Sequence, residues 1–81
     1  MRKTYNNAIR NANEYGVFIS TGTCGDIYFR DAENNFLAKM FRSCEGRMWT
    51  GATAHPEITG KKYGTKAAVA DWCMDWAANG F

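Results

Sequence analysis

Residues 27–50 read IYFRDAENNFLAKMFRSCEGRMWT, and this stretch decides the fold. Two runs rich in aromatic and aliphatic residues, 27–30 and 36–43, flank a cluster of Asp, Glu and Asn that is typical of a turn. The pair at 45–46, Glu-Gly, predicts a tight reversal into a third strand at residues 47–50. Because short connections join neighbouring strands, the stretch predicts an antiparallel meander.

Helical patterns lie on both sides of this meander. Upstream, four apolar residues recur at the helical period and predict an N-terminal helix over about residues 4–15: Tyr5, Ala8, Ile9 and Ala12. Residues 17–21 then favour a further strand. Downstream, the stripe that predicts a C-terminal helix consists of Val69, Trp72, Cys73 and Trp76. Thr65 is its expected N-cap, and Asp71 and Asp75 are expected on its solvated flank.

Residues 51–64 contain the only proline, Pro56, and predict a loop with room for a short strand around Ile58. The predicted fold is therefore α+β, a single compact domain over residues 1–81. It has an N-terminal helix, a three- or four-stranded antiparallel meander and a C-terminal helix, with both helices on one sheet face. The other sheet face is then left open.

Composition narrows the class of protein. A chain of 81 residues can bury one core. Its formal net charge of +2, from ten basic and eight acidic residues, is too small for a strongly basic nucleic-acid binder. No apolar run approaches the roughly 18 residues that span a bilayer, and the polar residues 1–7 predict no secretion signal. We therefore expect a cytoplasmic protein, in the host-cell cytoplasm if it is phage-encoded.

The three cysteines, Cys24, Cys44 and Cys73, are an odd number without a C-x-x-C pair, which predicts reduced and mostly buried thiols. The only histidine, His55, precedes Pro56 in an extended loop. Together these four residues lack the close ligand spacing of zinc sites, and no activated nucleophile or paired carboxylates stand out. The sequence predicts no enzyme, no metal site and no cofactor.

Alternation along the strands separates two sheet faces. The face covered by the helices is predicted to hold Ile27, Phe29, Phe36, Ala38, Met40 and Met48. The opposite face is predicted to hold Tyr28, Arg30, Leu37, Lys39, Phe41, Arg47 and Trp49. Aromatic residues and arginine are enriched in binding hot spots and also stack on bases, so this second face is the first candidate for partner binding.

The same pattern is compatible with a two-sided core. In that arrangement the loop of residues 51–64, or the N-terminal helix, covers Phe41 and Trp49. A shift of one residue in register would also exchange the two faces.

A second candidate is the group of Lys61, Lys62 and Lys66 with Tyr63, just before the C-terminal helix. The positive end of a helix dipole there would favour an anion. The alternative is that these lysines are solvated loop residues.

Three stretches carry a resemblance: FLAKMFR at 36–42, GRMWTG at 46–51 and TKAAVADW at 65–72. In pattern they resemble the three-strand-plus-helix DNA-binding domain of plant ethylene-response factors and of phage integrase arms. That resemblance implies DNA contacts from the sheet face, through Arg30, Lys39, Arg47 and Trp49. The order helix, sheet, helix also resembles double-stranded-RNA-binding domains.

The overall profile is similar to that of small phage accessory inhibitors of the anti-CRISPR type. This resemblance implies a compact body that competes sterically with a substrate, and it carries no site residues of its own.

The leading prediction is a non-enzymatic, phage-type inhibitor that docks on a nucleic-acid-handling protein complex and blocks substrate binding. It would be a monomer or homodimer. The predicted contact residues are Tyr28, Arg30, Lys39, Phe41, Arg47, Trp49, Lys61, Lys62 and Lys66. The first alternative is a small DNA- or RNA-binding module that uses the same sheet face, and the second is a structural subunit or homodimer.

Overall fold

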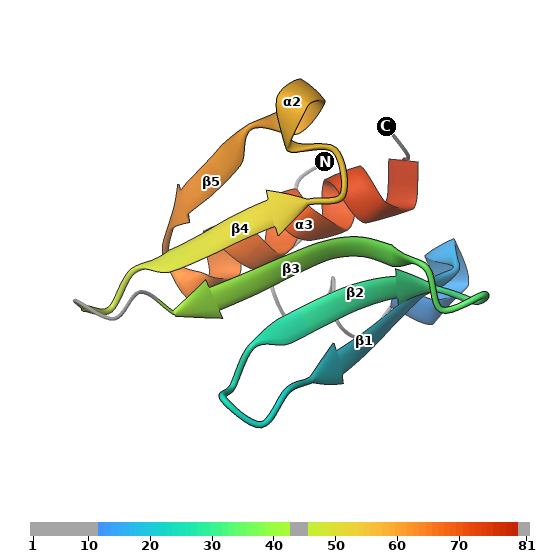
Figure 1. Cartoon of the computed structure of the whole chain (residues 1–81), viewed down its shortest axis with the longest axis horizontal. Coiled ribbons are helices and arrows are strands. Elements are labelled where there is room, and N and C mark those ends of the chain that lie inside the picture. Colours follow the sequence, from blue (N-terminus) through green and yellow to red (C-terminus); the bar gives the residue numbers. More distant parts are fainter. Residues whose placement is uncertain (1–11, 43–45, 80–81) are drawn as a thin grey trace.

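Five antiparallel strands form one open sheet in the computed structural model of the protein, which describes residues 12–42 and 46–79 (Figure 1). The strands follow one another across the sheet in sequence order. They are β1 (Val17–Thr21), β2 (Ile27–Asp31), β3 (Phe36–Arg42), β4 (Trp49–Thr53) and β5 (Lys61–Gly64). The sheet is therefore a simple meander.

The long helix α3 (Lys66–Asn79) crosses one face of the sheet and packs mainly on β3 and β4. Two short helical turns complete the described chain, the 3-10 helix η1 (Ala12–Tyr15) and α2 (Pro56–Thr59). In Figure 1, α3 lies behind the sheet, and none of the described helices lies on the face turned to the viewer. None of the described helices is long and apolar enough to cross a membrane.

The predicted α+β class, the antiparallel meander and the C-terminal helix are confirmed, and the sheet has five strands rather than three or four. The N-terminal helix predicted over residues 4–15 lies mostly outside the described residues. Its last residues, 12–15, form the 3-10 helix η1 beside β1.

The prediction of a loop over residues 51–64 is wrong. Strand β4 continues to Thr53, and β5 follows the turn of α2. Ile58 belongs to α2 rather than to a strand, because Pro56 occupies the first helical turn, where its missing N–H is not needed. Gly60, at a φ of 68°, then turns the chain into β5.

The hydrophobic core fills the space between α3 and the sheet. Its largest fully buried side chains are Phe29, Met40, Val17, Val69 and Cys73. The prediction that Asp71 is solvated is wrong, since only 6% of this residue is exposed. The flank of α3 that carries Asp71 therefore faces the protein.

Thr65 caps the N-terminus of α3 as predicted, because its Oγ1 accepts a hydrogen bond of 3.3 Å from the backbone N–H of Ala68. We expect Thr65→Ala to lower the free energy of unfolding by about 1 kcal/mol, since one N–H of the first turn loses its acceptor. Urea unfolding followed by circular dichroism measures this loss. Thr65→Ser keeps the acceptor and should stay close to the wild type; equal losses in both variants would contradict the capping role.

Candidate partner-binding face

The strand pairing brings eleven outward-pointing residues together on the side of the sheet opposite α3. We call this surface the open face. It consists of Phe18 and Ser20 from β1, Tyr28 and Arg30 from β2, Phe36, Lys39 and Phe41 from β3, Thr50 and Ala52 from β4, and Lys61 and Tyr63 from β5.

The middle row of the open face crosses all five strands. Tyr28 pairs with Ser20 on one side and with Lys39 on the other, and Lys39 pairs in turn with Ala52, which pairs with Lys61. Along β3, the partly buried Lys39 alternates with fully buried neighbours. This alternation is why the polar side chains point away from α3.

Two cations of the open face lie over aromatic rings of the same face. The guanidinium carbon of Arg30 is 5.0 Å from the ring centroid of Tyr28, and Nη1 of Arg30 donates a 3.1 Å hydrogen bond to Oγ of Ser20. The ammonium of Lys39 is 5.5 Å from the ring centroid of Phe41. Each contact contributes about 0.5–1 kcal/mol at a surface and holds the cation near its ring.

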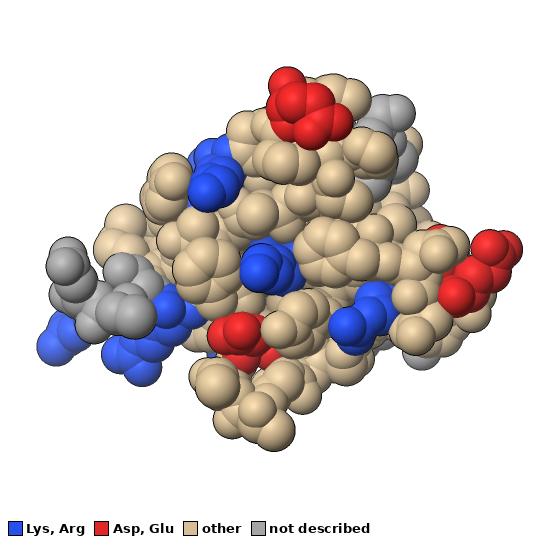
Figure 2. Space-filling model, viewed as in Figure 1, with Lys and Arg blue, Asp and Glu red and all other residues tan. Residues whose placement is uncertain are grey.

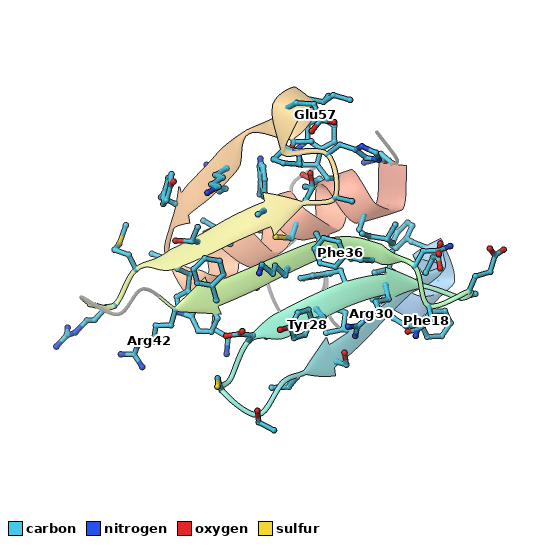
Figure 3. The ribbon with its side chains drawn as sticks, in the orientation of Figure 1. Phe18, Tyr28, Arg30, Phe36, Arg42 and Glu57 are labelled. Atoms are coloured by element: carbon cyan, nitrogen blue, oxygen red, sulfur yellow. The ribbon has the colours of Figure 1, made fainter. Side chains whose placement is uncertain are left out.

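Phe18 and Phe36 flank Arg30, the pairing residue on β2. These phenylalanines are 45% and 39% exposed, respectively. Figure 3 shows both on the side of the sheet where Tyr28 and Arg30 lie. The outer end of the open face is therefore an arginine between two accessible aromatic rings.

The turn after β2 explains why Phe36 is on this face although it was predicted on the covered one. Oδ1 of Asp31 accepts hydrogen bonds from the backbone N–H groups of Glu33 and Asn35, at 2.9 and 2.8 Å. The bond from Asn35 is the main cause that lowers the pKa of Asp31. Directly after this turn, a register shift pairs Phe36 with Arg30. Leu37, predicted on the open side, packs against the hydrophobic core.

Trp49 does not belong to the open face, contrary to the prediction. Trp49 lies on the same side of β4 as Gly51 and Thr53. This side faces α3, because a Cβ at Gly51 would meet Val69 and Cys73 of that helix. Trp49 accordingly packs against the core and lies beneath the ammonium of Lys66, 5.3 Å from its ring centroid.

Met48, predicted to be covered, is 52% exposed. It lies just before β4, since that strand begins only at Trp49. Arg47 also lies in the connection before β4, exposed and outside the strand rows.

The lysines of the second candidate site are divided between two sides of the sheet. Lys61 belongs to the open face, where Tyr63 is 63% exposed. Lys62 pairs with Gly51, which faces α3, and Lys66 lies over Trp49. The structure therefore joins Lys61 and Tyr63 to the first candidate site and does not form a cluster of three lysines.

Charge on the open face is of one sign. None of its eleven residues is acidic, and three are basic: Arg30, Lys39 and Lys61. Among the described residues, none of these cations forms an ion pair. Figure 2 shows separate basic patches across a mostly uncharged surface, with acidic groups at α2, at the turn between β2 and β3 and at the start of β2.

No family model, curated protein or solved structure matches the chain. The resemblances drawn from sequence patterns therefore stay predictions. The open face and the chemistry of its residues are therefore the features that bear on function.

The histidine and the two described cysteines are not among the eleven residues of the open face. Nδ1 of His55 is 3.4 Å from Oε1 of Glu57, at an exposed position beside α2. Cys73 is buried, and its burial raises the pKa of the thiol to about 12; Cys24 is exposed, and Cys44 lies outside the described residues. Within residues 12–42 and 46–79, no three potential metal ligands are grouped.

Sequence reasoning did not assign Phe18 to the site. Strand β1 reads Val-Phe-Ile-Ser-Thr, and its alternation places the buried Val17 on one face and Phe18 on the other. That alternation was the available signal. Phe36 had no such signal, since its position depends on the register shift.

Proposed function

We propose that the protein is a non-enzymatic binding protein that docks a protein partner on its open face. The observation that carries this proposal is a sheet surface on which aromatic rings alternate with cations that form no ion pair among the described residues, and which no helix within residues 12–42 and 46–79 covers. A surface that merely contacts water does not need these residues. Their types are the ones that dominate protein-binding hot spots.

Exposure of the aromatic rings supports binding. Phe18, Phe36 and Tyr63 each leave more than a third of their surface in water. Phe18 and Phe36 lie on either side of Arg30, and Tyr63 lies at the opposite corner of the face. Exposed aromatic residues of this kind are enriched at the centres of binding surfaces. A partner that covers these rings gains the free energy of burying them, about 25 cal/mol for each Å² of apolar area.

We further propose that binding is inhibitory, in the manner of phage-type, anti-CRISPR-like inhibitors. A small domain attached to a nucleic-acid-handling complex excludes substrate from the surface that it covers. This mechanism needs docking and bulk but no catalytic group. It follows from the profile of the sequence, and the open face supplies the docking surface.

Binding of single-stranded nucleic acid is the second candidate. Aromatic rings beside cations on an open sheet are the arrangement with which many proteins stack bases and hold phosphates. Two observations favour protein instead. Arg30 and Lys39 already occupy ring faces of Tyr28 and Phe41, and the net charge is only +2.

A matched capture experiment tests the proposal. The immobilised wild type and a Tyr28→Ala/Lys39→Glu variant are each incubated with extract of the native host, and bound proteins are quantified by mass spectrometry. The amount of partner bound to the variant should fall by a factor of about ten or more, because the variant lacks the ring of Tyr28 and reverses the charge at Lys39. Purified partner should then lose nucleic-acid binding when the wild type is added.

Arg42→Glu is the control for charge. Arg42 is exposed at the end of β3, and its alternation places it on the side of α3; Figure 3 shows it reaching away from the sheet. This variant should capture the partner as the wild type does. Equal capture by all three proteins would contradict docking on the open face. Recovery of nucleic acid alone, lost steeply as salt rises, would favour the second candidate.

A further inference from the structure

The size of the open face limits what can occupy it. Five strands at spacings of about 4.8 Å, each about five residues long at about 3.3 Å per residue, give a surface of roughly 19 by 17 Å. A globular partner usually covers about 800 Å² on each side, which is about two and a half times this area. An extended segment of about six residues, at about 3.3 Å per residue, spans the face fully.

Two of the three cations, Arg30 and Lys39, lie along a diagonal of the sheet. Arg30 is the diagonal neighbour of Lys39, since Lys39 pairs with Tyr28, two positions before Arg30 on β2. Diagonal neighbours are about 7–8 Å apart. Alternate residues of an extended chain are separated by about 6.6 Å and point to the same side. Two acidic side chains with one residue between them therefore match Arg30 and Lys39.

The next step along the same diagonal reaches Thr50 on β4. Thr50 pairs with Phe41 on one side and Tyr63 on the other. Its hydroxyl-bearing side chain is short, so the two aromatic rings border a low position in the surface. An apolar side chain two residues beyond the second acid would lie at this position.

Resting on the proposed function, we infer that the open face binds an extended acidic segment of the partner protein. The segment carries two acidic residues one position apart and an apolar residue two positions further on, in one or the other chain direction. Its carboxylates form ion pairs with Arg30 and Lys39, and Lys61 adds positive charge nearby. The apolar side chain packs between Phe41 and Tyr63.

Charge complementarity supports this occupant. The open face presents Arg30, Lys39 and Lys61, and none of the three has an ion-pair partner among the described residues. The carboxylate nearest to them that the hydrogen bonds identify is that of Asp26, which lies at the edge of the face and accepts a 3.4 Å hydrogen bond from the hydroxyl of Tyr28 rather than pairing with a cation. A basic segment would bring like charges together, which costs binding free energy. An uncharged segment would leave the cations partly desolvated and unpaired.

A random hexapeptide display library, selected on the immobilised wild-type protein, provides the defined probe. The selected sequences should be enriched in the pattern acidic, any, acidic, any, apolar, read in either direction. A synthetic peptide of this pattern should bind about ten-fold more weakly to Arg30→Met and to Lys39→Met, as measured by fluorescence anisotropy. Arg42→Met, a matched change on the α3 side, should leave its affinity unchanged. A peptide with the second acid replaced by lysine should regain affinity for Lys39→Glu.

The outcomes separate this inference from the proposed function. Selected peptides that lack acidic enrichment, yet lose binding in Phe41→Ala and Tyr63→Ala, would overturn the inference and leave docking on the open face intact. Peptides that bind the wild type and all open-face variants equally would contradict both. A homopolymeric thymidine oligonucleotide that binds more tightly than every selected peptide and competes with them would also overturn the inference.

Discussion

Gly51→Ala should lower the free energy of unfolding by about 1–3 kcal/mol, the usual cost of overpacking a core. A Cβ at this position would lie 2.8 Å from Cγ1 of Val69, 3.0 Å from Sγ of Cys73 and 3.2 Å from Cε3 of Trp72. All three atoms belong to side chains of α3, so the helix must move away from β4 or the side chains must leave their packing positions. Urea unfolding, followed by tryptophan fluorescence, measures the loss.

An opposing effect exists but is smaller. Replacing glycine by alanine reduces the entropy of the unfolded chain, which stabilises a protein by about 0.4–1 kcal/mol where the backbone tolerates it. Gly46→Ala isolates this effect, because no heavy atom of the described residues beyond the chain neighbours lies within 4 Å of a Cβ at Gly46. We expect Gly46→Ala to raise the free energy of unfolding by at most about 1 kcal/mol, whereas Gly51→Ala should lower it. A Gly51→Ala variant as stable as the Gly46→Ala variant would show that α3 does not approach β4 so closely.

The sequence predicts well those parts of the fold in which the periodicity of apolar residues matches burial. Strands β2 and β3 were predicted because buried and exposed residues alternate in both, from Ile27 to Arg30 and again around Met40. Helix α3 was predicted because its stripe includes Val69 and Cys73, which are fully buried. Strong periodicity that matches burial is the most reliable local signal.

Strand β5 was missed for a related reason. It reads Lys-Lys-Tyr-Gly, and its residues on the side of α3 are Lys62 and Gly64, so no apolar alternation marks it. Asp71 was misplaced because α3 carries alanines and aromatic residues on most of its circumference, which leaves no clearly polar flank to identify.

The candidate site divides in the same way. Tyr28, Arg30, Lys39 and Phe41 were assigned together by alternation within two strands, and the structure places them on one face. Trp49 was predicted on the wrong face because alternation within one strand does not determine how its faces match those of the preceding strand across a turn. In the structure Trp49 pairs with Arg42, and Thr50 pairs with Phe41. Gly51 could have indicated the correct face, because a glycine leaves room for a helix to pack closely against its strand. Trp49, two residues before it, lies on the same side.

Cys73 should react with a thiol reagent about a thousand-fold more slowly in the folded protein than in urea. Burial raises the pKa of its thiol to about 12, whereas an unfolded cysteine has a pKa of about 8.5. The thiolate is the reactive form, so at pH 8 the folded protein holds over a thousand-fold less of it. Ellman's reagent with mass spectrometry of the modified peptides measures the two rates in a Cys44→Ser background. Cys24, which is exposed, is the internal control and should react readily in both states.

The same burial makes stability depend on alkaline pH. Below about pH 8.5 the Cys73 thiol is protonated in both the folded and unfolded states, so its contribution to stability is fully present. As pH rises toward 12, only the unfolded chain ionises, and the free energy of unfolding falls by about 1.4 kcal/mol for each pH unit. Every other ionisable group is the same in Cys73→Ala, so the difference in slope between the wild type and this variant from pH 8.5 to 10 isolates the contribution of Cys73. Cys24→Ala should keep the wild-type slope; if Cys73→Ala keeps it as well, the thiol is not buried as the packing of α3 on β3 and β4 requires.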